Sequence, residues 1–383
     1  MSGSSSSIDG GAWQELMGRD LRLKLLHSNN DNHHHKKNAS IEVGDVVSFD
    51  WKGFILNSNG CEVDDDVIPD FSEEVPFTEQ KHWIISMGNN EIEPALEMGI
   101  RFMKDGQEGI IMSNFRFCSG LKSFLPEQQT FPMYFLVKVN KVVKSECLAN
   151  IEKNFCLEHG LSQKQIGNFY FGCDDGSGVL YKKACRIYAG AADMVKEAKI
   201  IGPDSLEDID SDLAQAALKL IIDCMNNVAM ANMKVKEYKN VKDVCGQIIQ
   251  FFDPNNLKAL CRAAQAATLE GNFEEADAAV KAALSVDSSN SDVKRMERFY
   301  LKSKREYKAR QKEMFTRMGS TFMSKTQKVK VENIGVLEDT PIESVDKKQL
   351  YVKYAIIFGA LLIYFLVTYC MIRYRSHLRG DEL

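Results

Sequence analysis

The sequence lacks the features that mark several common classes of protein. None of its ten cysteines belongs to a Cys-x-x-Cys pair, so we expect reduced thiols and no metal or cofactor. It has no excess of positive charge, because 48 Lys and Arg against 53 Asp and Glu give a net charge of −5, which disfavours general nucleic-acid binding. The opening residues, MSGSSSSIDGG, contain no apolar stretch of the kind that a signal peptide needs. We therefore expect the N-terminus to lie in the cytosol.

One apolar run differs from this ordinary composition. Residues 354–372 carry no charge, and a helix of that length, at 1.5 Å per residue, spans about 28 Å of the roughly 30 Å hydrocarbon core of a bilayer. Tyrosines and basic residues flank the run on both sides, as at membrane interfaces. The flanking charges disfavour the alternative of a buried core helix. We expect a single-pass tail anchor in a lipid bilayer over 351–373 and a short lumenal tail over 374–383.

The last three residues bear on which membrane holds this anchor. Asp381-Glu382-Leu383 is similar to an endoplasmic-reticulum retrieval signal, but Gly380 stands where Lys or His is usual. A short span with a basic tail suits the mitochondrial outer membrane equally. The endoplasmic reticulum is the expectation, and the mitochondrial outer membrane is the alternative.

The composition changes along the rest of the chain. Residues 1–40 are polar and low in complexity, so we expect disorder there, with a short amphipathic turn or helix within 12–26. Residues 41–146 hold short β-rich runs separated by turn signals, with one helical stretch near 92–102. The predicted fold class is α+β, with a twisted antiparallel sheet wrapping one short helix.

Residues 150–292 have a helical and repetitive pattern. Residues 253–256 (DPNN) return as 287–290 (DSSN), a period of about 34 residues that is typical of tetratricopeptide repeats. We predict an all-α domain of three such repeats. A basic extension helix over 293–325, with eleven Lys or Arg against three Glu, and a linker over 326–350 follow.

Four motifs within 41–146 carry a family resemblance. GDVVSFDWKG (44–53), MGNNEI (87–92), MKDGQ (103–107) and FLVKV (135–139), in this order, resemble the FKBP immunophilins, the macrolide-binding peptidyl-prolyl isomerases. Such enzymes need no nucleophile, since an apolar cavity that favours the twisted amide lowers the barrier of about 18–20 kcal/mol. The resemblance implies an FKBP-like sheet with an isomerase-like site.

The site residues implied by the resemblance are only partly retained. Those that match are Trp51 (in place of a Tyr), Asp64, Ile92 and Phe135. Those that depart are Val63 for a Phe, Leu96 for the floor Trp, and Ser119 for a Tyr. Glu93 adds a charge at the expected rim, while Phe124 and Leu125 are candidates to replace part of the lost wall. We expect weak isomerase activity at best, and a purely structural role is the alternative.

The first helices of the three repeats resemble carboxylate-clamp tetratricopeptide domains. The clamp residues implied are Lys164, Asn168, Asn227, Lys258 and Arg262. Because residues i and i+4 share a helix face, these side chains are expected to face one groove. The cations suit an acidic side chain and the amides suit a free carboxylate at the end of an extended peptide. The clamp's known ligands are the C-terminal tails of heat-shock protein 90 and its seventy-kilodalton relative; an ordinary solvated helix face is the alternative.

The whole layout resembles the membrane-anchored FKBP immunophilins with tetratricopeptide repeats. The principal hypothesis is a membrane-tethered co-chaperone that binds such a chaperone tail and presents a degenerate FKBP domain to prolyl-containing clients. The alternatives are an active prolyl isomerase and a chaperone-independent membrane scaffold. The helix over 293–325 also resembles a calmodulin target, against the alternative of a repeat-capping helix with a solvated basic side.

Overall fold

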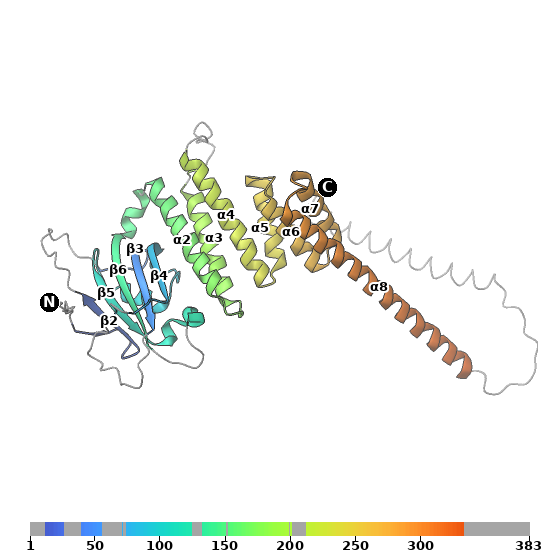
Figure 1. The fold of residues 1–383 in the computed structure, drawn as a ribbon, viewed down its shortest axis with the longest axis horizontal. Helices are drawn as coiled ribbons and strands as arrows, with labels where there is room; N and C mark the ends of the chain where they lie inside the picture. The colour runs from blue at the N-terminus through green and yellow to red at the C-terminus, as the bar shows by residue number, and fades with distance from the viewer. Residues whose placement is uncertain are drawn as a thin grey trace, which may run out of the picture. The chain divides into compact units, whose positions relative to one another are not determined.

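The computed structural model describes residues 12–26, 40–55, 71, 74–124, 132–150, 152–198, 200 and 212–332. The chain divides into one compact unit that ends at Arg310 and a second that begins at Gln311. The first unit consists of a β-sheet followed along the chain by a series of helices (Figure 1).

The described strands form a six-stranded antiparallel sheet in the order β1-β2-β5-β6-β3-β4. The strands are β1 (Gln14–Glu15), β2 (Leu21–Leu26), β3 (Val46–Ile55), β4 (Thr78–Ser86), β5 (Glu108–Ser113) and β6 (Met133–Val143). Helix α1 (Pro94–Ile100) packs against β2, β5 and β6 with Leu96 and Ile100 fully buried. The predicted antiparallel sheet around one short helix is thereby confirmed.

The N-terminal segment differs from the expectation. The amphipathic turn or helix predicted within 12–26 is wrong, because these residues form β1 and β2, and β2 pairs with β5 along its whole length. The reason lies in the alternation of LRLKLL, which buries Leu21 and Leu23 in the core. On the other face, Trp13 covers Arg22 and Lys24 at 5.6 and 5.8 Å from its ring centre. The sheet therefore begins well before residue 41.

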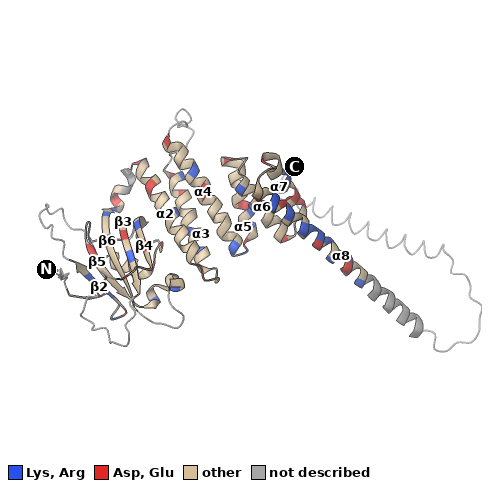
Figure 2. Cartoon of the chain, viewed as in Figure 1, with Lys and Arg blue, Asp and Glu red and all other residues tan. Residues whose placement is uncertain are grey.

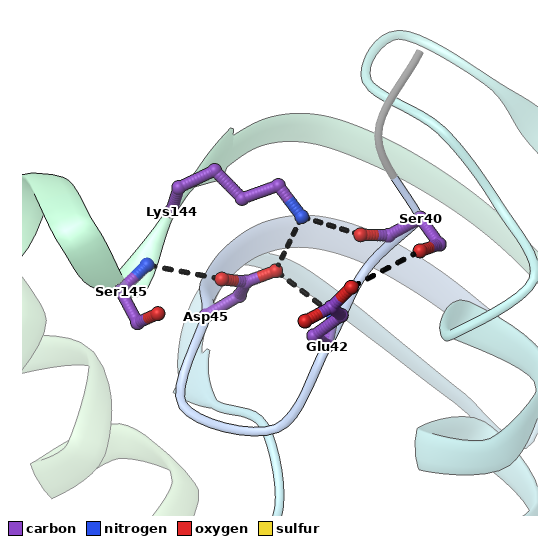
Figure 3. Close-up of polar contacts among 5 residues, drawn as sticks. All are labelled: Ser40, Glu42, Asp45, Lys144 and Ser145. Carbon is purple, nitrogen blue, oxygen red and sulfur yellow. Dashed lines mark hydrogen bonds and ion pairs between the residues drawn. The ribbon is translucent and has the colours of Figure 1, made fainter.

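The buried carboxylate of Asp45 joins the start of β3 to the end of β6 (Figure 3). The Asp45 side chain accepts hydrogen bonds from the backbone N–H groups of Glu42 (2.8 Å) and Ser145 (3.0 Å), and Lys144 Nζ lies 2.8 Å from it. Lys144 also donates to the Ser40 carbonyl. Burial raises the pKa of Asp45, but Lys144 and the two backbone donors outweigh it, so the pKa lies below its usual value. The end of β6, the last strand along the chain, is thus held to the start of β3.

The helices form successive antiparallel hairpins, in which each helix from α3 to α7 packs on the one before it. They are α2 (Lys153–Cys173), α3 (Val179–Glu197), α4 (Asp212–Lys234), α5 (Tyr238–Gln247), α6 (Leu257–Glu270), α7 (Phe273–Val286) and α8 (Ser291–Glu332). Short 3-10 turns occupy Phe115–Phe117 (η1), Ser119–Phe124 (η2) and Ser145–Asn150 (η3), and a π-helical turn, η5, covers Ile248–Phe252. This helical region is like a tetratricopeptide array.

Helix α8 is longer than the sequence predicts. The basic helix expected over 293–325 continues to Glu332, so the first residues of the predicted 326–350 linker are helical. Along the part of α8 that Figure 2 colours, Lys and Arg outnumber Asp and Glu. Among the residues up to 332 that the structure describes, no helix is long and apolar enough to cross a membrane. The predicted anchor over 351–373 and the tail over 374–383 lie outside the described residues.

Candidate functional site

Aromatic rings from three strands, one 3-10 turn and one helix meet where the sheet contacts α2. We call them the aromatic cluster: Trp51 on β3, Trp83 on β4, Phe124 on η2, Phe135 on β6 and Phe169 on α2. Trp51 is central, with ring centres 5.3 Å from Trp83 and 5.8 Å from Phe135, both edge to face. These three side chains are at most 1% exposed. The sequence-predicted positions Trp51 and Phe135 are therefore brought together.

Phe169 enters this cluster from outside the sheet domain. Its ring centre lies 5.4 Å from Trp83, 5.9 Å from Trp51 and 6.1 Å from Phe124. The sequence analysis missed this residue, because α2 belongs to the first repeat and was expected only to line a peptide groove. The available signal was the aromatic run Phe169-Tyr170-Phe171, which is bulkier than the alanine-rich packing of the later hairpins requires.

The other residues predicted for the isomerase-like site differ in burial. Ile92 and Leu96 are buried in the same core, while Ser119 is exposed. Phe124 contributes a ring to the cluster, where the sequence analysis proposed it as a replacement wall. Asp64, Val63 and Leu125 lie outside the described residues.

Glu93 corrects an expectation. The sequence predicts a charge at the rim of the isomerase-like site, but Glu93 is 2% exposed. Its carboxylate accepts from the Gly120 backbone N–H at 3.0 Å and lies 3.3 Å from Lys183 Nζ of α3. Lys183 also donates to the Ile92 carbonyl at 3.0 Å. Burial lowers the pKa of Lys183, although the Glu93 carboxylate opposes this effect. Glu93 thus supplies an ion pair between the sheet domain and the helices.

Two neighbouring side chains of α2 hydrogen-bond to the edge strand β4. Ser162 Oγ accepts from the Ile84 backbone N–H at 2.6 Å, and Gln163 Nε2 donates to the Ile84 carbonyl at 2.9 Å. Gln163 Nε2 also donates to Glu91 Oε2 at 2.6 Å, and burial raises the pKa of this carboxyl group. An edge strand needs such partners, since its outer N–H and C=O groups otherwise lack them. Helix α2 therefore caps the sheet edge.

A second group of polar side chains runs along the first helices of the hairpins. We call it the polar row: Lys164, Asn168, Asp223, Asn226, Asn227 and Arg262 on α2, α4 and α6. These helices are neighbours, α2 with α4 and α4 with α6. Asn168 Oδ1 accepts from Asn227 Nδ2 at 3.3 Å and from the Tyr188 hydroxyl at 2.7 Å. Two predicted clamp residues, Asn168 and Asn227, thus meet, and Lys164 lies one turn before Asn168 on α2.

The cations of the polar row are already paired within the chain. Lys164 Nζ lies 2.6 Å from Asp223 Oδ2, and Arg262 donates to Asn226 Oδ1 at 2.6 Å. Burial lowers the pKa of Arg262. Lys258, the fifth predicted residue, is exposed one turn earlier on α6. The sequence analysis missed Asp223 and Asn226, although Asp223 lies four residues before Asn227 and so shares its face.

No family model matches the sequence. The structure is similar to a multi-domain immunophilin from Arabidopsis thaliana, with a TM-score of 0.30 and 16% identity over 72% of this chain and 98% of that one. The C-terminal TPR-containing domain of a Plasmodium falciparum FK506-binding protein matches with a TM-score of 0.35 and 21% identity over 42% and 98% of the chains.

A third similar structure is the Hsp90 co-chaperone Cns1 from Saccharomyces cerevisiae. It has a TM-score of 0.36 and 17% identity, over 46% of this chain and 48% of that one. Identities and TM-scores this low leave the function of this chain to be argued from its own contacts.

Proposed function

We propose that this protein is an FKBP–tetratricopeptide co-chaperone whose polar row binds the acidic C-terminal tail of heat-shock protein 90 or of the seventy-kilodalton chaperone. The observation that carries the proposal is the direct Asn168–Asn227 contact, with Lys164 one turn before Asn168 on α2 and Arg262 of α6 bonded to Asn226, the residue before Asn227. Two amides and two cations in one row suit a peptide that ends in a free carboxylate beside an acidic side chain.

The contacts that Asn168 and Lys164 make without a peptide indicate which of their groups a bound peptide would engage. The Asn168 carbonyl oxygen is engaged by Tyr188 and Asn227, which directs its amide nitrogen toward the terminal carboxylate. An acidic side chain of the peptide replaces Asp223 as the partner of Lys164. Lys258 and Arg262 supply the remaining charge-assisted bonds, which are stronger than those between neutral groups.

The test is binding of an acidic C-terminal pentapeptide to the full chain. Each lost bond to a charged group is worth about 1.5–3 kcal/mol, so Lys258→Ala with Arg262→Ala is expected to weaken binding by more than about tenfold. Lys281→Ala with Lys302→Ala removes the same charge from exposed positions on α7 and α8, and is the matched control. Equal affinity of both double variants contradicts the clamp and favours a chaperone-independent scaffold.

The sheet domain is proposed to present prolyl-containing clients rather than to turn them over. An active prolyl isomerase is the second candidate, favoured by the burial of Trp51, Ile92 and Phe135 in one core. Phe169 argues against it, because its ring already packs on Trp51 and Trp83. A proline-isomerisation assay on the full chain decides: a rate well above background supports the enzyme.

We also propose the tail anchor over 351–373, in the endoplasmic reticulum, on the sequence alone. Deletion of 351–383 is expected to release the chain from membranes, and retention after deletion contradicts the anchor.

Calmodulin binding to α8 is proposed from its exposed Met314, Phe315 and Met318 among basic residues. Calcium-dependent retention of the full chain on calmodulin tests it.

A further inference from the structure

We infer that helix α2 is an intramolecular occupant of the aromatic cluster, with Phe169 in the place of an external ligand's compact apolar ring. The sheet domain is then closed to a prolyl peptide until α2 withdraws. This inference concerns the sheet domain, and it does not require the polar row to bind a chaperone tail.

The ring contacts of Phe169 are the first evidence. The ring lies edge to face with Trp51 and Trp83, at 84° and 74°, and is stacked with Phe124 at 15°. Aromatic pairs prefer these arrangements, and a compact ring carried by a ligand would use the same faces. Phe169 and an external ring therefore compete for one site.

The Trp51 indole is the second evidence. Its Nε1 is buried, and within the described part of the chain no acceptor lies within hydrogen-bond distance of it. A buried donor without a partner destabilises the folded chain, because it has lost its hydrogen bond to water. Phe169 has only carbon atoms to offer, whereas an amide carbonyl beside a prolyl ring is an acceptor. Phe169 thus fills the space within the aromatic cluster but gives the Trp51 N–H no acceptor.

Polar contacts flank Phe169 where the helices meet the sheet domain. Ser162 and Gln163 bond the Ile84 backbone, and Lys183 pairs with Glu93. Water replaces the two bonds to Ile84 when the surfaces part, so each adds little net stability to the contact. The apolar core that α2 shares with the sheet is therefore what keeps Phe169 in the aromatic cluster.

The family departures on the sheet side fit the same arrangement. Glu93 replaces an aliphatic rim residue and is buried against Lys183, and its neighbour in space, Gly120, donates to it. The Glu93 carboxylate therefore holds the helices rather than a ligand. The sheet domain thus has a residue that pairs with α3 at a position where the FKBP resemblance places the rim of the ligand site.

Phe169→Ala in the full chain tests the inference, and Phe171→Ala is its control. Phe171 lies on the same helix, is also partly buried, and packs on Tyr181 at 4.9 Å. The readouts are the catalysed isomerisation of a proline-containing tetrapeptide and the change in tryptophan fluorescence when this peptide is added. Phe169→Ala is expected to raise the catalysed rate by about tenfold over the unmodified chain, with a saturable fluorescence change, while Phe171→Ala does neither.

The result that overturns the inference is a folded Phe169→Ala chain with no rate gain and no fluorescence response. An equal gain in Phe171→Ala overturns it too, since general loosening of the helices would then explain the effect. Phe169→Leu keeps an apolar side chain, and decides by the same two readouts if the alanine variant does not fold. Pentapeptide binding separates the two proposals: Lys258→Ala with Arg262→Ala affects only the polar row, and Phe169→Ala only the aromatic cluster.

Discussion

Lys164 has a carboxylate partner before any peptide arrives. Asp223 lies 2.6 Å from its ammonium group, and both side chains are partly exposed. A partly exposed ion pair is worth up to about 1 kcal/mol. Replacing Asp223 with Asn removes this internal competitor, so we expect the affinity for an acidic C-terminal pentapeptide to rise by about two- to fivefold.

Titration calorimetry on the full chain measures this change. Asp193→Asn removes a more exposed carboxylate from α3, where it pairs with Lys196, and is expected to leave the affinity unchanged. Weaker binding by Asp223→Asn would mean that Asp223 orients Lys164 for the ligand instead of competing with it.

His159 on α2 gives the protein a specific dependence on pH. It is 4% exposed, and burial lowers its pKa from 6.5 to about 4. The unfolded chain therefore binds the proton first as the pH falls, and the folded state loses stability from about pH 6.5 down to about pH 4. Between pH 7 and pH 5 this residue is expected to cost about 2 kcal/mol of unfolding free energy.

His159→Gln removes that term while keeping a polar group beside Gln163. Urea unfolding at pH 7 and pH 5 is expected to show a loss smaller by about 2 kcal/mol in the variant. Parallel losses in both chains would place the imidazole in contact with solvent in the folded state.

At the residue scale, the sequence predicts which residues belong to the polar row better than it predicts which of them pair with one another. Lys164, Asn168 and Asn227 follow from the resemblance to carboxylate-clamp repeats, and the i, i+4 spacing adds only that Lys164 and Asn168 share one face of their helix. Asp223 and Phe169 were missed because their roles depend on contacts between different elements. Helical spacing places Phe169 on α2 but says nothing of the tryptophans that it meets.

Among the elements, α2 and α3 approach each other closely at a glycine. A Cβ atom on Gly167 would meet the Tyr188 ring at 2.5 Å, and the Tyr188 hydroxyl is itself bonded to Asn168. Gly167→Ala must move this ring, and such overpacking costs about 1–3 kcal/mol. We expect a lower unfolding free energy and weaker pentapeptide binding, because Asn168 loses its partner.

Gly190→Ala on α3 is the matched control, since a Cβ there meets nothing within 4 Å. The same change in this open helical position is expected to stabilise the protein by about 0.5–1 kcal/mol. Chemical denaturation of both variants compares them, and stabilisation by Gly167→Ala would contradict the close α2–α3 packing.

The elements that the sequence predicts best are those whose buried residues follow one long and regular pattern. The hairpins followed from the period of about 34 residues. Strand β2 was missed because its alternation is short and its partner β5 lies far along the chain. Helix α2 buries His159, Ser162 and Gln163 beside the sheet and Ile166 and Tyr170 in the core, so no single apolar stripe marks it.

For the whole molecule, the distribution of the core decides which parts unfold together. One hydrophobic cluster runs from Leu21 in the sheet through α2, α3 and α4 to the α6 residue Ala266. The last hairpin and α8 have small separate clusters, such as that of Ala276, Val280 and Tyr300. Stability follows such contiguous units, with each opening at its own free energy.

Hydrogen exchange followed by mass spectrometry is expected to report this division. Amides of β3, β6, α2 and α3 should share one opening free energy, while α7 and the start of α8 open at a lower one, because their alanine-rich clusters bury less apolar area. In Phe169→Ala the sheet and α2 should separate into two values, whereas Phe171→Ala should lower the protection of the helices without splitting the sheet from α2. Independent exchange of the sheet and α2 in the unmodified chain would mean that their shared core does not couple them, and α2 would then leave the aromatic cluster freely.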